Sequence, residues 1–359
     1  MVTLPETMRR YACNQQGCCC SGWRISLKPA DLVRLRTHLT REEAEKLGDA
    51  QGPLDAAEEG ACRFLMSDGK RCEVHANHGV EALPDICLDF PVAPYPGSRG
   101  VEFHFDALCP SVLDRIVDDP APPVLVDVDE SQDEAMHRRA ANVWPAPELR
   151  VGAATISPEA FRSVREQILS HLGSDTETAA DAMHAIDLAY ASLAGGDAEA
   201  FAIGSQTVTP KYLRFLARCE AAHGAGTLVR VWEQYRRFVF DIRREGPGFD
   251  ELATHLGRFP EARARFYAPS EALLQPLLLR YVAHRHAMPF LTIQGRLHFA
   301  PGAVPHLVGT AIRCASALGG VFRRPVDRSM LKVALGWSEF VYRSLEVEPA
   351  ALPWFGITE

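Results

Sequence analysis

The chain has 359 residues, of which 47% are hydrophobic and 23% are charged, and this composition excludes a disordered, fibrous or small disulfide-stapled protein. Its formal net charge of −8 gives no overall attraction to nucleic acid or to anionic lipid. At roughly 150 residues per domain, this length predicts about two domains.

The first ten residues contain no apolar core of a secretory signal, and no apolar stretch approaches the roughly 18 residues needed to cross a membrane. We therefore expect a cytoplasmic protein that does not contact membranes. Because cytoplasmic thiols are kept reduced, a concentration of cysteines there indicates a metal site rather than disulfides.

In chain order, the first predicted element is a helix that begins near Pro29 and ends at Gly48. The apolar residues between them are spaced for one helix face. Residues 101–105 alternate between apolar and polar, which predicts a short strand leading to Cys109. The rest of the N-terminal third has little periodicity and many Gly and Pro residues, as is typical of a domain folded around a metal centre.

Eight of the ten cysteines fall within the first 109 residues. They are Cys13, Cys18, Cys19, Cys20, Cys62, Cys72, Cys87 and Cys109. Three adjacent cysteines cannot all face a hydrophobic core, and a glycine-containing loop lets their sulfur atoms converge. The turn at Asp68-Gly69 brings Cys62 and Cys72 together. We predict that the metal ligands come from these eight residues, and we interpret Cys219 and Cys314, each alone on an apolar helix face, as core residues.

The kind of metal centre is a separate question, because thiolates suit both structural zinc and iron-sulfur clusters. The spacing does not form two Cys-x-x-Cys knuckles, as in a zinc ribbon, nor the Cys-x3-Cys-x2-Cys triad of radical enzymes. Eight thiols exceed one tetrahedral site. We favour an iron-sulfur cluster, of the 4Fe-4S type, and keep zinc as the alternative. His75 and His78 rank low as nitrogen ligands because sulfur is plentiful.

A Pro- and Asp-rich run opens residues 117–150, which we predict to be a linker and connecting segment. Beyond it, apolar residues are spaced by three and four, as in amphipathic helices. These predicted helices are 158–171, 178–194, 209–222, 227–244, 271–286, 304–318 and 326–345. The predicted fold is mainly α, with an irregular cysteine-rich metal-binding domain at residues 1–116 and an α-helical bundle at residues 151–359.

Two further patterns in the helical region receive structural interpretations. His223-Gly-Ala-Gly226 is a candidate cofactor-binding turn, but it follows a helix rather than a strand, so we interpret it as a helix–helix turn. His284 and His286 stand at the C-terminal end of a predicted helix and are candidates for a site there, but we favour the interpretation that the helix dipole stabilises them at this position.

The cysteine motifs resemble a known family. Cys-Cys-x-Gly-Trp-x-Ile at 19–25, Cys-x-Phe-Leu with Asp-Gly-x-x-Cys at 62–72 and Leu-x-x-x-Cys-x-x-Phe-Pro at 83–91 are similar to the YkgJ-type cysteine-cluster family of zinc- or iron-chelating proteins. Cys109-Pro110 and the long helical remainder resemble more narrowly its flagellin lysine-N-methylase (FliB-like) branch. The first cysteines are spaced more tightly than in the family, and Leu88 stands where the family usually has Arg.

The resemblance implies a metal or iron-sulfur centre and S-adenosylmethionine-dependent methylation of a lysine in a flagellin-like protein or peptide. It assigns no catalytic or cofactor-binding residue. Methyl transfer needs a neutral amine held in line with the donor, so we expect a desolvated pocket with a carboxylate or Tyr as base. Two alternatives remain: a non-catalytic protein with a structural zinc or iron site whose helical domain binds a partner, and an enzyme whose metal does redox or Lewis-acid chemistry on another peptide.

Overall fold

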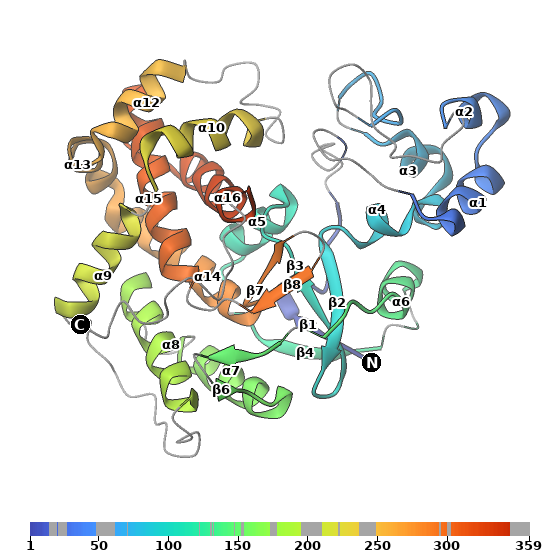
Figure 1. Cartoon of the computed structure of the whole chain (residues 1–359), viewed down its shortest axis with the longest axis horizontal. Helices are drawn as coiled ribbons and strands as arrows, with labels where there is room; N and C mark the ends of the chain where they lie inside the picture. Colours follow the sequence, from blue (N-terminus) through green and yellow to red (C-terminus); the bar gives the residue numbers. More distant parts are fainter. Residues whose placement is uncertain are drawn as a thin grey trace.

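The computed structural model describes most of the chain. The described residues are 1–13, 20, 27–47, 62–69, 71–121, 123–129, 131, 133–146, 148–151, 154–172, 178–194, 210–221, 223–236, 249–293, 296–299 and 303–344. They form a mainly α-helical fold, as predicted. In Figure 1 a small sheet lies between the short helices of the N-terminal region and the longer helices that follow residue 157. Within the described part, none of the helices is both long enough and apolar enough to cross a membrane.

The sheet has four short strands in the order β2-β3-β1-β4. They are β1 (Val2–Pro5), β2 (Val92–Gly97), β3 (Gly100–Phe105) and β4 (Leu125–Val128). β1 runs parallel to β3 and antiparallel to β4. β3 confirms the predicted strand, whereas the other three were not predicted. β2 contains Pro94 and Pro96, which a strand tolerates at a sheet edge because edge N–H groups are not all needed for pairing.

Residues 117–150 contain ordered elements. β4 pairs with β1 along the sheet edge, and α6 (Glu134–Ala141) lies against β2. α5 (Pro110–Asp118) follows Cys109 directly and packs against α14 (Glu271–Ala287). One large hydrophobic core joins the sheet to the helices, with residues from β1, β3 and α5 in the same cluster as those of α14. The division of the chain into domains at residues 116 and 150 stays a prediction.

All seven helices predicted after residue 157 are present, with ends within a few residues of the expected ones where they can be compared. They are α7 (Pro158–Leu172), α8 (Ala179–Ala194), α9 (Pro210–Glu220), α10 (Ala225–Tyr235), α14, α15 (Ala303–Phe322) and α16 (Arg328–Ser344). The predicted continuation of α10 to residue 244 lies outside the described residues. His223 and Gly224 lie between α9 and α10, and Gly226 is in the first turn of α10, which confirms a helix–helix connection.

Several short elements complete the fold and were not predicted. They are α12 (Phe249–Gly257), α13 (Phe259–Ala262), η5 (Arg263–Tyr267), η6 (Ala268–Ser270) and two hairpins, β5 (Arg150–Val151) with β6 (Ala154–Thr155) and β7 (Phe290–Ile293) with β8 (Arg296–Phe299). α15 packs against α16, α9, α12 and η5. Its Cys314 is fully buried, as is Cys219 on α9, which confirms both as core residues.

Gly309 sets the distance between α15 and α9. A Cβ at this position would stand 2.8 Å from the backbone nitrogen of Glu220 and 3.0 Å from the carbonyl carbon of Cys219. Backbone atoms cannot move aside as a side chain would. We expect Gly309→Ala to lower the free energy of unfolding by about 1–3 kcal/mol, the usual cost of overpacking, even though Ala is about 1 kcal/mol better than Gly in a helix.

The control is Gly226→Ala in α10, because a Cβ there meets no atom within 4 Å. That variant is expected to keep or slightly raise the stability. Urea denaturation of both variants measures the difference, and equal stabilities would show that α9 and α15 do not meet at Gly309.

The dipole interpretation of the histidines at the end of α14 is wrong. His284 and His286 are 0% and 1% exposed, and burial lowers their pKa values to about 4 and about 3. A helix C-terminus would favour the charged form and raise the pKa. Desolvation therefore dominates, and both side chains are neutral in the folded protein. His284 Nε2 lies 2.9 Å from Thr7 Oγ1, a hydrogen bond that links α14 to the segment after β1.

The predicted N-terminal helix is two helices rather than one. α1 (Pro29–His38) and α2 (Arg41–Glu45) are separated at Leu39 and Thr40. Thr40 Oγ1 accepts a hydrogen bond from the backbone of Glu43, and the Glu43 carboxylate accepts one from the backbone of Thr40. This capping box starts a new helix and overrides the continuous apolar spacing.

Candidate metal centre

Four of the eight predicted cysteine ligands lie in one small hydrophobic cluster, separate from the main core. Cys20 and Cys62 are buried in it, and Cys72 and Cys87 pack against it partly buried. Apolar residues from α1 and the segments around it fill the rest of the cluster: Leu35, Leu39, Leu47, Phe64, Val74, Ala82, Leu83 and Leu88. The cluster belongs to the region of α1, α2, α3 (Glu73–His78) and α4 (Asp85–Asp89) in Figure 1. Residues that are 67 positions apart in sequence, from 20 to 87, thus share one local core.

Backbone hydrogen bonds place Cys20, Cys62 and Cys72. The backbone N–H of Cys62 donates to the carbonyl of Cys20 at 2.7 Å, which joins the first cysteine segment to the second. The predicted turn at Asp68-Gly69 is present, and across it Cys72 forms a backbone bridge with Leu65. Gly69 has φ 67°, a conformation that glycine adopts readily.

Cys87 lies on α4 (Asp85–Asp89). Three arginine side chains donate hydrogen bonds to backbone carbonyls just before and within this helix. Arg34 of α1 and Arg138 of α6 donate to the carbonyl of Leu83 at 2.9 and 3.3 Å. Arg139 donates to the carbonyl of Leu88 at 2.9 Å. The side chain of Leu88 is itself buried in the small core. The connecting segment therefore helps to position Cys87, a role that its sequence did not reveal.

The other cysteines lie elsewhere or outside the described residues. Cys109 is 2% exposed in the main core, with its Sγ 3.6 Å from the hydroxyl of Tyr11. Cys13, two residues beyond Tyr11, is exposed. Cys18 and Cys19 lie outside the described residues. The structure thus brings Cys20, Cys62, Cys72 and Cys87 into one cluster and places Cys109 in the neighbouring core.

The donor chemistry fits zinc and iron, since thiolates bind both. Among the residues that the structure describes, no three His, Cys, Asp or Glu side chains form a group that could hold a metal ion. The assignment of the eight cysteines as ligands stays a prediction.

Side-chain hydrogen bonds join two helices beside the cluster. His78 Nε2 of α3 (Glu73–His78) lies 2.8 Å from the carboxylate of Glu43, and Asn77 donates to the same carboxylate at 2.9 Å. Hydrogen bonds from Asn77, Thr40 and His78 lower the pKa of Glu43 to about 2.

A buried carboxyl group in the helical region was not predicted from sequence. Asp187 on α8 is 8% exposed, and burial raises its pKa to about 7, against the lowering effect of a hydrogen bond from Tyr212 on α9. Strongly shifted acids gather at functional sites, although structural networks also produce them. An Asp within the apolar spacing of Met183, Ile186 and Tyr190 was the signal that sequence analysis overlooked.

The raised pKa of Asp187 makes stability depend on pH. Its folded pKa of about 7 exceeds the ordinary value of 3.8, so the unfolded chain releases this proton at lower pH than the folded protein does. The contribution of Asp187 to stability therefore falls as pH rises from about 4 to about 7 and is constant above that. We expect Asp187→Asn to raise the free energy of unfolding by roughly 2–4 kcal/mol at pH 8, and by much less at pH 5.

Urea denaturation at the two pH values measures this gain. Asp250→Asn, at an exposed position at the start of α12, is the control and should not raise the free energy of unfolding comparably at pH 8. A gain for Asp187→Asn that is the same at both pH values would contradict the raised pKa.

Comparisons with known proteins agree with the cysteine-cluster resemblance. Residues 12–110 match the CxxCxxCC family model, described as "Putative zinc- or iron-chelating domain". The chain is 27% identical over 136 residues to a lysine-N-methylase of Salmonella typhimurium, a stretch that covers 33% of this chain and 33% of that protein. It is 27% identical, again over 136 residues, to the flagellar biosynthetic protein FliU of Salmonella muenchen, covering 33% of this chain and 78% of that protein.

The match therefore spans a third of the length of the lysine-N-methylase. No solved structure matches this chain. The comparisons support the cysteine-rich region as a zinc- or iron-chelating domain and a distant similarity to proteins named lysine-N-methylase.

Proposed function

We propose that the cysteine-rich region binds an iron-sulfur cluster of the 4Fe-4S type through thiolates drawn from its eight cysteines. The observation that carries the proposal is the gathering of Cys20, Cys62, Cys72 and Cys87 in one small core, from segments that a family model of zinc- or iron-chelating domains covers. A core of this size has few apolar side chains, so metal binding would supply folding free energy that packing does not. Bound there, the cluster would supply electron transfer or Lewis-acid chemistry.

We further propose that the protein methylates a lysine in a protein substrate of the flagellin type, with S-adenosylmethionine as donor. The support is the similarity to proteins named lysine-N-methylase and flagellar biosynthetic protein. In this reaction the lysine nitrogen forms a bond to the methyl carbon as the bond to sulfur breaks. The sulfonium leaves as a neutral thioether, and the amine loses its proton to a base. The protein's part is to hold the amine neutral, desolvated and in line with the donor.

Metal analysis of protein purified without air tests the first proposal. The preparation is expected to be brown, with broad visible absorption, and to contain iron and acid-labile sulfide. A colourless protein with stoichiometric zinc would overturn the iron-sulfur assignment and support the structural-zinc alternative.

Calorimetric titration with S-adenosylmethionine, followed by mass spectrometry of a flagellin incubated with the full chain, tests the second proposal. We expect saturable binding and the mass increase of added methyl groups on lysine. Absence of binding to the metal-loaded protein would rule out the methylase function, and would leave a metal-binding protein whose helices bind a partner.

A further inference from the structure

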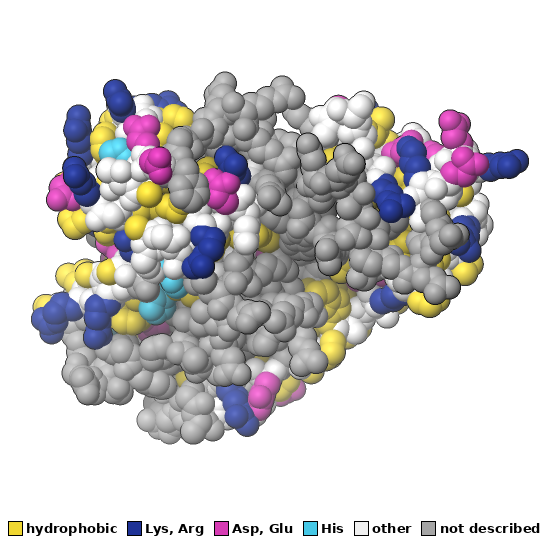
Figure 2. All heavy atoms as spheres, turned by 45° about the horizontal axis from the view of Figure 1, so that its top comes forward, with side chains coloured by type: hydrophobic (Ala, Val, Ile, Leu, Met, Phe, Trp, Pro, Cys, Tyr) yellow, Lys and Arg dark blue, Asp and Glu magenta, His cyan; other side chains and the backbone are white. Residues whose placement is uncertain are grey.

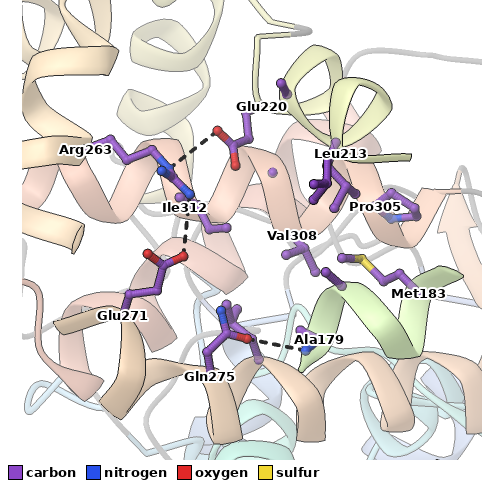
Figure 3. Close-up of a pocket in the computed structure, with 15 residues that line it drawn as sticks. Ala179, Met183, Leu213, Glu220, Arg263, Glu271, Gln275, Pro305, Val308 and Ile312 are labelled. Carbon is purple, nitrogen blue, oxygen red and sulfur yellow. Dashed lines mark hydrogen bonds and ion pairs between the residues drawn. The ribbon is translucent and has the colours of Figure 1, made fainter. Parts of the chain in front are cut away.

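A cavity of about 280 Å³ lies among α8, α9, α14 and α15, far from the cysteine-rich helices (Figures 1 and 3). Apolar side chains from all four helices form most of its wall. They include Met183, Leu213, Leu216, Leu278, Val308 and Ile312. Its volume is at the lower end of ligand sites in proteins, which suits one side chain or a small molecule rather than a nucleotide.

One end of the cavity is charged. Arg263 of η5 lies between two carboxylates, with its Nε 3.7 Å from Glu220 at the end of α9 and its Nη2 3.5 Å from Glu271 at the start of α14. Figure 3 shows these three side chains on one side of the cavity and Met183, Leu213 and Pro305 on the other. Two carboxylates and one guanidinium leave one excess negative charge at this end.

The charged end is only partly screened by water. The side chains of Glu220, Arg263 and Glu271 are 17%, 36% and 39% exposed. Burial raises the pKa of Glu220, and Arg263 counteracts this only in part. Both ion-pair contacts of Arg263 are longer than an ordinary hydrogen bond, and among the described residues its Nε has no hydrogen-bond partner. The two carboxylates are therefore not saturated by the single cation between them.

We infer that this cavity binds an aliphatic ammonium group, the chemistry of a lysine side chain, with the methylenes along the apolar wall and the ammonium at the charged end, beside the Glu220 and Glu271 carboxylates. An anionic ligand would be repelled by the two carboxylates, and the positive charge of Arg263 is already neutralised by them. Charge therefore favours an ammonium ligand over an anionic one. The identification of the ligand as a substrate lysine rests on the proposed function, in which the bound ammonium must give its proton to a base before the amine can attack the methyl group. The preference for an ammonium rests on the cavity alone.

Ligand titrations of the full chain, as purified, test the inference. They require no added metal, no S-adenosylmethionine and no catalytic turnover. The probe is n-butylamine, observed through the ¹³C-labelled methyl group of Met183, whose resonance is identified by its loss in Met183→Leu. We expect saturable shifts with n-butylamine, and affinity that rises about threefold per methylene from ethylamine to n-butylamine. Butyrate and n-butanol at matched ionic strength should bind at least tenfold more weakly.

Butyrate binding as tightly as n-butylamine, or no saturable shift with any amine, would overturn the inference. Because these titrations use the unaltered protein, a folding defect in a variant cannot obscure the result. Binding of the amine without methylation would leave the cavity assignment intact and count against the proposed function. Methylation with no amine binding in this cavity would support the proposed function and overturn the cavity assignment.

Charge variants give an independent test with opposite expected signs. Glu220→Gln is expected to weaken n-butylamine binding about tenfold, because it removes one carboxylate. Arg263→Gln is expected to strengthen it several-fold, because it removes the competing cation. Glu261→Gln, an exposed carboxylate on α13 outside the cavity, is the matched control and should change nothing. Weaker amine binding in Arg263→Gln would show that the site prefers an anion.

Discussion

Cys20→Ser and Cys87→Ser are each expected to lose the bound metal and to unfold the small core of residues 20–88. A serine hydroxyl stays protonated at neutral pH and does not replace a thiolate as a ligand. Cys20 is 6% exposed and Cys87 packs against the same cluster, so each change also places a polar hydroxyl beside apolar side chains. Structural zinc contributes on the order of 10 kcal/mol to the folding of small domains, so metal loss outweighs the packing change.

Cys314→Ser is the matched control. Cys314 is fully buried in α15, far along the chain from the cysteine-rich region, and burial raises the pKa of its thiol well above the ordinary value, so it stays protonated. This variant should keep its metal content, with some loss of stability in the helical region. Metal-to-protein ratios of anaerobic preparations and limited proteolysis of residues 20–88 measure the two effects. Normal metal loading in both Cys20→Ser and Cys87→Ser would refute the ligand assignment.

Glu102→Gln is expected to lower the free energy of unfolding by about 3–5 kcal/mol, because it leaves the charge of Arg165 buried without a partner. Arg165 on α7 and Glu102 on β3 form an ion pair in which the side chains are 1% and 5% exposed. The hydroxyl of Tyr95 on β2 donates to the same carboxylate at 2.7 Å, and Arg165 also reaches the carbonyl of Ala287 at the end of α14. The pair thus joins the sheet to two helices of the bundle.

An exposed ion pair is the control for the buried pair of Arg165 and Glu102. Arg41 and Glu45 on α2 are 97% and 71% exposed with 3.9 Å between their charged atoms, so Arg41→Gln should cost at most about 0.5 kcal/mol. The double variant Glu102→Leu with Arg165→Met should recover much of the lost stability, since it buries no charge. Urea denaturation of the three proteins measures these differences. A cost for Glu102→Gln no larger than that for Arg41→Gln would contradict a buried pair.

Features that arise from neighbouring residues were predictable from the sequence. The spacing of apolar residues predicted all seven long helices after residue 157, because a helix repeats its contacts every three or four residues. The turn at Asp68-Gly69 was predictable because glycine and aspartate favour it locally. The prediction failed where two local signals conflicted. The apolar spacing of residues 29–48 predicted one helix, but the capping box at Thr40 starts a second helix there.

Burial also overturned a local interpretation. Position at a helix C-terminus favours a charged histidine, but His284 and His286 are enclosed by segments distant in sequence, and desolvation makes them neutral. The strands β1 and β4 were missed for a related reason. Each has four residues, too few for an alternating pattern, and each is stabilised by pairing with a segment more than 90 positions away.

The sequence by itself determined the mainly α fold, the positions of the long helices and the concentration of thiols that indicates a metal, because each depends on composition or on contacts within a few residues. Only the tertiary structure decided which cysteines share a core, that Arg138 and Arg139 position the Cys87 segment, and that Glu220 and Glu271 flank Arg263 at a cavity. These arrangements join residues from separate elements, and the free energy that holds them comes from burial and long-range hydrogen bonds that leave no periodic pattern in the chain.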